Sequence, residues 1–164
     1  MRRPAPLAGP LRLLFPLMLF AASLPARGQS PAAVATPVEA AGIIGMQLAS
    51  AVDAFGLPQS MFMFRGSDPS RDDVVFYYPN HMYLFWYKDR VWQVRYDRRS
   101  TATVYGVSLG MSRGEVEASV PERPLVASGD SLYFDLDDAS FPVRVRLVFA
   151  GDTVTDIYVY RSDF

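Results

Sequence analysis

Few residues in this chain could carry out chemistry. His81 is the only histidine among 164 residues, and there is no cysteine. The sequence contains neither a Gly-x-Ser-x-Gly elbow nor a phosphate-binding glycine loop. His81 follows Pro79 and Asn80, which are typical of a hairpin turn, so we expect a solvated turn residue at this position. The sequence therefore predicts no catalytic residue, no metal site and no cofactor, and a protein that is not an enzyme.

One acidic cluster has the oxygen atoms that calcium prefers. Asp135, Asp137 and Asp138 lie close together in the sequence, with Asp130 nearby. Calcium takes about six or more oxygen ligands, and the cluster lacks the glycine and the distal glutamate of an EF-hand loop. We predict an ordinary hairpin turn here, with a calcium site as the alternative.

A third group of residues is aromatic or cationic, and strand alternation places it on one face of a sheet. Between residues 143 and 149, apolar side chains alternate with Arg144 and Arg146, so both arginines should point away from the core. The same alternation in other strands gives an outward set of ten residues: Tyr77, Tyr83, Phe85, Tyr87, Arg95, Tyr133, Arg144, Arg146, Tyr158 and Tyr160. Tyrosine and arginine are enriched at binding hot spots, so we predict that this face binds a partner protein. Two alternatives stay open: the lead-in or the other half of the chain covers the face, or strand propensity alone selected the aromatic residues.

The elements that would position these residues are two helices and eight strands. A helix over Gln47–Phe55 should end at Gly56 and Pro58, and a second over Arg113–Val120 should begin with a capping box between Ser112 and Glu115. Runs of β-branched and aromatic residues separated by short turns predict the strands. These runs are Met61–Arg65, Val74–Tyr78, Met82–Lys88, Val91–Tyr96, Leu125–Ser128, Ser131–Leu136, Val143–Phe149 and Val154–Tyr160.

The two halves of the chain resemble each other. Gly45 aligns with Gly110, and Leu84 aligns with Leu147 at nearly the same offset. The sequence therefore predicts an α+β fold made by tandem duplication of a helix plus a four-stranded antiparallel sheet. The two units could share one eight-stranded sheet with the helices on one face. The first unit would span residues 42–97 and the second 105–164, with a bridge over 98–104.

Several turn and cap motifs resemble those of a known family. They are Gly45-Met46, Phe55-Gly56-Leu57-Pro58, Lys88-Asp89-Arg90-Val91, Gly110-Met111-Ser112 and Gly151-Asp152-Thr153-Val154. In these motifs the chain resembles the SmpA/OmlA (BamE-type) envelope proteins, whose domains share a fold with the tandem-repeat β-lactamase inhibitor proteins. The resemblance implies a non-catalytic envelope protein. The lipidated cysteine of the envelope proteins and the disulfides of the inhibitors have no counterpart here, because the chain has no cysteine.

The segment over residues 1–28 is typical of an export signal. Arg2 and Arg3 precede a nearly apolar run over Leu11–Leu24, and small residues at Ala26 and Gly28 predict cleavage between Gly28 and Gln29. Cleavage after Ser23 is the alternative. The apolar run is shorter than the roughly 20 residues that a membrane span needs, which favours cleavage. A signal that is retained as a membrane anchor is the alternative. Residues 29–41 are rich in proline and alanine and should form a flexible lead-in.

Cleavage would change the charge of the protein. Four arginines and no acidic residue lie in residues 1–28, so 12 basic and 17 acidic side chains would be left, a net charge of −5. An acidic chain of this kind argues against nucleic acid as a partner, and a membrane becomes a partner only if the signal is retained.

These observations predict an exported, non-catalytic binding protein of the bacterial envelope, periplasmic or secreted. It would use its open sheet face to bind another protein, either as an envelope assembly accessory or as an inhibitor of a secreted enzyme. The alternative function is a small ligand carrier or hydrolase with a cavity between helix and sheet.

Overall fold

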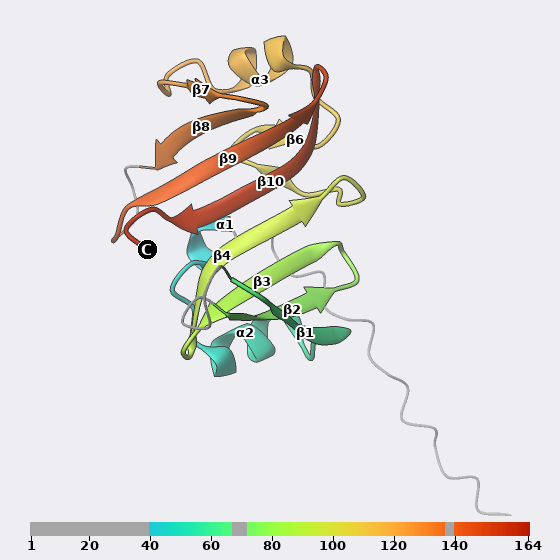
Figure 1. Cartoon of the computed structure of the whole chain (residues 1–164), viewed down its shortest axis with the longest axis vertical. Helices are drawn as coiled ribbons and strands as arrows, with labels where there is room; N and C mark the ends of the chain where they lie inside the picture. The colour runs from blue at the N-terminus through green and yellow to red at the C-terminus, as the bar shows by residue number, and fades with distance from the viewer. Residues whose placement is uncertain (1–39, 67–71, 137–139) are drawn as a thin grey trace, which may run out of the picture. The chain divides into compact units, whose positions relative to one another are not determined.

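The computed structural model describes residues 40–66, 72–136 and 140–164 (Figure 1). The expected signal peptide, its cleavage point at Gly28 and Gln29, and residues 29–39 of the expected lead-in lie outside the described residues. No helix in the described part of the chain is long and apolar enough to cross a membrane.

The described residues form three helices, α1 (Ala40–Ile43), α2 (Leu48–Phe55) and α3 (Arg113–Ser119). The expected capping box begins α3: the Glu115 N–H donates to Ser112 Oγ at 3.4 Å, and the Ser112 N–H donates to Glu115 Oε2 at 2.7 Å. Gly56 follows the last residue of α2 with φ +76, a conformation that glycine adopts without strain. Both predicted helices are therefore confirmed to within one residue at each end.

Eight strands form one antiparallel sheet in the order β1-β2-β3-β4-β10-β9-β8-β7 (Figure 1). In the N-terminal half they are β1 (Ser60–Phe64), β2 (Asp73–Tyr78), β3 (Met82–Tyr87) and β4 (Arg90–Asp97). In the C-terminal half they are β7 (Val126–Ser128), β8 (Ser131–Leu136), β9 (Val143–Ala150) and β10 (Thr153–Arg161). The two halves join where β4 pairs with β10, so an α+β fold with one eight-stranded antiparallel sheet is confirmed.

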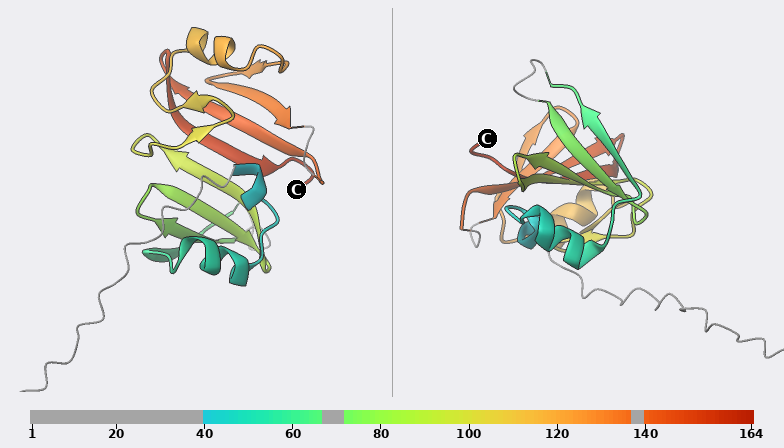
Figure 2. Two further views of the ribbon diagram at one scale, coloured as in Figure 1. Left: turned by 180° about the vertical axis from the view of Figure 1, so that it is seen from behind. Right: turned by 90° about the horizontal axis from the view of Figure 1, so that it is seen from below.

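The core lies between the helices and one face of the sheet, which we call the inner face. Leu84 and Leu147 are fully buried there, as expected, and Trp86 and Phe149 are 5% and 4% exposed. Helix residues such as Ile43, Ala51 and Val116 belong to the same apolar cluster. Seen from behind, α1 crosses the middle of the sheet (Figure 2), where it contacts β4 and β10. The described helices therefore cover the inner face and leave the opposite, outer face without a helix.

Two short elements lie where the sequence predicted irregular chain. Ala40 and Ala41, which we assigned to the lead-in, belong to α1, and Ala40 is buried in the core. The bridge over 98–104 contains β5 (Thr103–Val104), which forms a hairpin with β6 (Val107–Ser108). Val104 and Val107 are buried in the apolar cluster, so the bridge contributes to the core rather than only linking two units.

Candidate binding face

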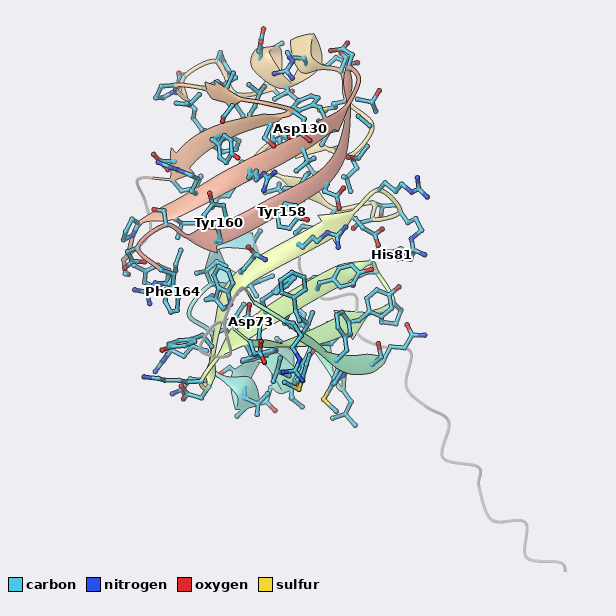
Figure 3. The ribbon with its side chains drawn as sticks, viewed as in Figure 1. Asp73, His81, Asp130, Tyr158, Tyr160 and Phe164 are labelled. Atoms are coloured by element: carbon cyan, nitrogen blue, oxygen red, sulfur yellow. The ribbon has the colours of Figure 1, made fainter. Side chains whose placement is uncertain are left out.

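The outer face of the sheet contains a groove of about 950 Å³. Figure 3 looks onto this face, with Asp73, Tyr158, Tyr160 and Phe164 labelled along it. Eight of the ten residues predicted for the partner-binding face line the groove: Tyr83, Phe85, Tyr87, Arg95, Tyr133, Arg146, Tyr158 and Tyr160. Tyr77 and Arg144 are not among the lining residues. The other lining residues are Phe62, Phe64, Gly66, Asp73, Trp92, Gln93, Asp163 and Phe164.

One end of the groove is built from aromatic rings. The Phe64 and Phe85 ring centroids lie 5.9 Å apart and the Phe85 and Trp92 centroids 6.3 Å apart, both edge to face. The Phe164 ring stacks on Trp92 at 5.8 Å and meets the Tyr87 ring edge-on at 5.0 Å. Offset and edge-to-face pairs of this kind are the favoured aromatic geometries, so this end is a packed apolar wall.

Phe85 differs from the sequence prediction. Alternation placed it correctly on the outer face, but we expected an open position, and the side chain is only 7% exposed. Phe64 and Trp92 pack against its ring. Phe85 therefore belongs to a second, smaller apolar cluster on the outer face. Its ring supports the Phe64 and Trp92 rings from below and has little contact with solvent.

A β-bulge turns Trp92 toward the groove. In the pairing of β3 with β4, Phe85 lies opposite Gln93 and Trp86 lies opposite Val91, so Trp92 has no partner across the strand. The extra residue lets both Val91 and Val94 stay in the core. The Trp92 side chain is held by a hydrogen bond from its Nε1 to Asp73 Oδ1 at 3.1 Å. Burial raises the pKa of Asp73, whereas this hydrogen bond opposes the shift.

The middle of the groove is formed by the pairing of β4 with β10. Arg95 lies opposite Tyr158, and its Nε donates to Asp156 Oδ1 at 2.8 Å. The guanidinium lies 5.2 Å from the Tyr83 ring centroid and 5.6 Å from that of Tyr158. Burial raises the pKa of Tyr158, although the positive charge of Arg95 opposes this shift. Arg95 is thus fixed by a carboxylate and by two aromatic faces.

The cation at the other end of the groove, Arg146, is less closely paired with a carboxylate than Arg95 is. Arg146 donates from Nε to Ser131 Oγ at 3.0 Å, and its contact with the Asp130 carboxylate is long, at 4.0 Å. Its guanidinium lies 5.9 Å from the Tyr133 ring and 5.7 Å from the Tyr158 ring. Its side chain is 40% exposed, so Arg146 presents positive charge to the groove.

Asp97 is the centre of a polar network beside the groove. It is 7% exposed, and it accepts hydrogen bonds from Tyr83 Oη at 2.8 Å and from the Arg99 backbone N–H and Nη2, both at 2.9 Å. The Arg99 guanidinium holds the pKa of Asp97 well below its usual range, against the opposing effect of burial. Burial also raises the pKa of Tyr83, with a further contribution from its hydrogen bond to Asp97. The network fixes the Tyr83 ring, which lines the groove.

His81 belongs to this network and is not a freely solvated residue. It lies in the expected turn with φ +60, but its side chain is 25% exposed. Its Nδ1 lies 3.0 Å from Tyr77 Oη and 3.9 Å from Asp97 Oδ1. The prediction of the turn was correct, and that of a solvated side chain was wrong because Tyr77 and Asp97 come from the neighbouring strands.

The acidic residues that could have held calcium are used differently where they are described. Asp135 pairs with Arg144 through contacts of 2.6 and 2.9 Å, which lower the pKa of Asp135. Asp130 accepts a hydrogen bond from Ser131 Oγ at 2.9 Å. Asp137 and Asp138 lie outside the described residues. Among residues 40–66, 72–136 and 140–164, no group of three His, Cys, Asp or Glu side chains is arranged to hold a metal ion.

No protein-family model matches this chain, and no curated protein matches it. Among solved structures, the fold is similar to an extracellular protein containing a SCP domain from Bacillus anthracis, with a TM-score of 0.52, 11% identity, and coverage of 85% of this chain and 50% of that chain. It is also similar to a cysteine-rich secretory protein from Staphylococcus aureus, with a TM-score of 0.50, 12% identity, and coverage of 79% and 48%. A DUF4309 family protein from Bacillus subtilis aligns with a TM-score of 0.44, 13% identity, and coverage of 71% and 78%.

These likenesses correct the family suggested by the sequence. The similar structures are SCP-domain proteins, not BamE-type envelope proteins or β-lactamase inhibitor proteins, so the resemblance based on Gly45-Met46 and related motifs was wrong. Those motifs consist of helix-cap and turn residues, which occur in many unrelated folds where a helix is followed by antiparallel strands. The chain spans about half the length of the first two structures, and at these identities the likeness is one of fold.

Proposed function

We propose that this chain is an exported, non-catalytic protein that binds another protein through the groove on its outer face. The observation that carries the proposal is the composition of the groove: eleven tyrosine, arginine and phenylalanine residues from both halves converge on one hollow. The described helices cover only the inner face, so none of them blocks the approach of a partner to this hollow. Aromatic and arginine side chains are the usual anchors of protein interfaces.

The two ends of the groove would contribute differently to binding. The wall around Trp92 and Phe85 offers apolar area, and aromatic area dominates interface energetics. Arg146 offers a cation at the opposite end, where the Asp130 carboxylate lies 4.0 Å away and compensates its charge only weakly. A segment with an apolar side chain at one end and a carboxylate at the other would fit both features.

Two observations support export. Residues 1–28 combine a basic start, an apolar run and small residues before Gln29. Two structures with a similar fold are those of an extracellular protein and a secretory protein. The narrower functions of assembly accessory and enzyme inhibitor depended on the family resemblance, so we propose neither.

A photo-cross-linking residue at Tyr87 tests the binding proposal. Tyr87 is 40% exposed and lines the groove, whereas Glu117 is exposed on α3 and serves as the matched control position. In the extracellular or envelope fraction of the producing organism, we expect a product from Tyr87 that is absent from Glu117 and is reduced by Arg146→Ala. The same products from both positions would contradict a groove-specific partner.

A small-molecule ligand is the second candidate. The volume of about 950 Å³ lies at the upper end of the range of about 300–1,000 Å³ that ligand sites occupy. The groove lies on the outer face, however, not between helix and sheet as the alternative prediction required. Mass spectrometry of the purified protein under native conditions separates the two candidates, because a retained small ligand adds a defined mass.

We further propose that the two halves are copies of one helix-plus-sheet unit. Gly45 N donates to Val91 O at 2.7 Å and Val91 N donates to Met46 O at 3.0 Å. The corresponding bonds in the C-terminal half are Gly110 N to Val154 O and Val154 N to Met111 O, both at 2.9 Å. Gly45 and Gly110 also share a positive φ, of +83 and +89. These contacts repeat the alignment of the two halves found in the sequence.

The joint between the halves supports the same proposal. Arg95 lies opposite Tyr158, which is also its counterpart in the alignment that matches Leu84 with Leu147, so each strand meets its own counterpart at this point. Such a register is what a two-fold relation between the halves requires. The bulge at Trp92 has its counterpart in the same alignment at Thr155. The match does not extend to α1, because the corresponding residues 105–108 include the start of β6 at Val107.

Amide hydrogen exchange tests this correspondence. We expect matched protection of the Gly45 and Gly110 amides and of the Val91 and Val154 amides, because the same bonds hold them. Protection in one half and free exchange in the other would contradict the proposed equivalence.

A further inference from the structure

Strand β1 lies at one edge of the sheet and is exposed along its whole length. Its one neighbour in the described sheet is β2, and all five of its residues are exposed. The exposed fractions of Met61, Phe62, Met63 and Phe64 are 64%, 45%, 57% and 53%. The apolar exposure continues into β2, where Val74, the partner of Met63, is 44% exposed.

The residue pattern of β1 is that of a strand inside a sheet. Phe62 and Phe64 line the groove on the outer face, and alternation directs Met61 and Met63 to the inner face. Both faces of β1 are therefore apolar, as in strands that are buried on both sides. Solvent-facing edge strands are usually short, charged or interrupted by proline, and Ser60–Phe64 contains neither a charge nor a proline.

The opposite edge shows the usual protection. Strand β7 has only three residues, Val126–Ser128, and two of them are alanine and serine. Pro124 precedes it by two positions. The two edges of the described sheet thus differ, and of these two β1 is the one that offers a long apolar strand.

We propose that β1 pairs antiparallel with β1 of a second copy of this chain, centred on Phe62. In this register Phe62 lies opposite Phe62 of the second copy, Met61 opposite Met63, and Ser60 opposite Phe64. The pairing gives hydrogen-bond partners to the backbone N–H and C=O groups at the free edge of both strands. It also covers the apolar side chains on both faces of the sheet. It joins two eight-stranded sheets into one.

The charges around β1 favour a second copy as the occupant. A two-fold pairing places identical residues opposite each other at its centre, so a charged residue there would face a like charge. Strand β1 has no charged residue and avoids this repulsion. Arg65 would lie opposite Gln59, and its charge is already paired with Asp72 at 2.7 Å.

The pairing would also extend the groove. Residues directly opposite in an antiparallel pair project to the same face, so Phe62 of the second copy would adjoin Phe62 and Phe64 at the apolar end of this groove. Each copy would then supply a side chain to the binding face of the other. The pairing itself does not depend on the partner that the groove binds.

The contact involves one five-residue strand on each side, whereas a standard stable interface has roughly 20–30 residues on each side. We therefore expect a reversible dimer. For the protein purified after export, the weight-average mass in sedimentation equilibrium should rise with concentration toward twice the chain mass.

Charge substitutions at the two edges test which strand is responsible. Phe62→Lys places two lysines opposite each other in the dimer, and we expect it to remain monomeric at concentrations where the wild type is mostly dimeric. Val126→Lys adds the same charge to β7, at a residue that is 62% exposed, and should leave the dimer unchanged. Mixing Phe62→Lys with Phe62→Glu should restore a dimer, whereas each alone should not form one.

A single cysteine tests the register, because the chain has none of its own. Opposite residues in an antiparallel pair have Cα atoms about 4.5–5.5 Å apart, which suits a disulfide. Phe62→Cys should form a cross-linked dimer on mild oxidation, and Val126→Cys should stay monomeric. Three results would overturn the proposal: a wild type that is monomeric at all concentrations, a dimer that Val126→Lys disrupts and Phe62→Lys does not, or equal cross-linking at both edges.

Discussion

The two halves of the sheet present different chemistry on the same face. In the N-terminal half the outer face carries a packed set of rings around Phe85 and Trp92, with Arg95 over the Tyr83 ring beside it. In the C-terminal half it consists of tyrosines and arginines, with Arg146 over two tyrosine rings and Arg144 paired with Asp135. When Leu84 is aligned with Leu147, Phe85 corresponds to Val148 and Trp92 to Thr155. The outer face thus carries a cluster of apolar rings in one half and a more strongly charged surface in the other.

This difference shows what the alternation of a strand can and cannot decide. Alternation determines the face on which a side chain lies, and the neighbouring strands decide whether that face is packed or open. Phe85 is buried because β1 and the bulge bring Phe64 and Trp92 against it. Substitutions at corresponding positions of the two halves can therefore show whether the packing differs as the ring contacts indicate.

Phe85→Ala should destabilise the protein far more than Val148→Ala. Phe85 is 7% exposed and packed between two rings, and truncating a buried phenylalanine costs about 3–5 kcal/mol in free energy of unfolding. Val148 is half-buried and loses less apolar area, so its truncation should cost below about 1.5 kcal/mol. Urea unfolding followed by circular dichroism measures both values. Equal losses would mean that the outer face is packed alike in both halves.

Gly45→Ala should cost more stability than Gly110→Ala, although the two glycines have similar positive φ angles. An L-residue at positive φ costs about 1–2 kcal/mol, which is all we expect at Gly110, where an added Cβ would meet no atom within 4 Å. At Gly45 the Cβ would lie 3.0 Å from Phe141 Cζ, so the total should exceed about 2 kcal/mol. The control is Gly45→Ala with Phe141→Leu, in which relief of the clash should recover part of the difference in thermal stability.

Asp97→Asn should cost about 1.5–3 kcal/mol, because charged hydrogen bonds at a buried carboxylate would be lost. Asp135→Asn should cost no more than about 1 kcal/mol, because the Asp135 and Arg144 side chains are 55% and 42% exposed. Denaturant titrations at neutral pH give both values. A larger loss at Asp135 than at Asp97 would reverse this part of the comparison.

The effect of Asp97 should also depend on pH in a defined direction. Arg99 lowers the pKa of Asp97 below its ordinary value of 3.8, so the folded state binds this proton less readily than the unfolded state does. The stability contributed by Asp97 is therefore complete above the unfolded pKa and is lost as the pH falls below it. We expect the difference between the wild type and Asp97→Asn to be constant at neutral pH and to shrink below pH ~4.

Phe164→Ala should have the smallest effect on stability. The side chain is 58% exposed, and an aromatic pair contributes about 0.5–1.5 kcal/mol, so the loss should lie at the low end of this range. Removing the stacked ring should expose Trp92, shift tryptophan emission to the red and increase quenching by iodide. Trp92→Phe is the control, because its remaining Trp86 is buried and should not respond to Phe164→Ala.

Much of the fold could be predicted from the sequence because its turns are explicit. Glycine, proline and aspartate separate the strand runs, so the predicted strand bounds agree with the structure to within about one or two residues. Ser112 and Glu115 located the start of α3. The order of the whole sheet could not be derived this way. Hairpins determine which strands pair within each half, but not which edge strands of the two halves pair with each other.

The site was predictable only in part, and Trp92 shows why. Strict alternation with Val94 would direct Trp92 to the core, but the bulge reverses its direction. The signal was present in the spacing, since Val91 and Val94, like Val154 and Ile157, are separated by an odd number of positions and not an even one. Phe62, Phe64 and Phe164 join the groove through long-range packing, for which no local pattern exists.

The position of β10 has a consequence for how the chain folds. It is the last strand in the described sequence, yet it pairs with β4 in the middle of the sheet. During synthesis, β4 therefore lacks its β10 partner until all the residues between these two strands have been made, and pairing between such distant segments is slow. A chain whose sheet is completed at its centre stays unfolded longer, which would suit the export that we propose for it.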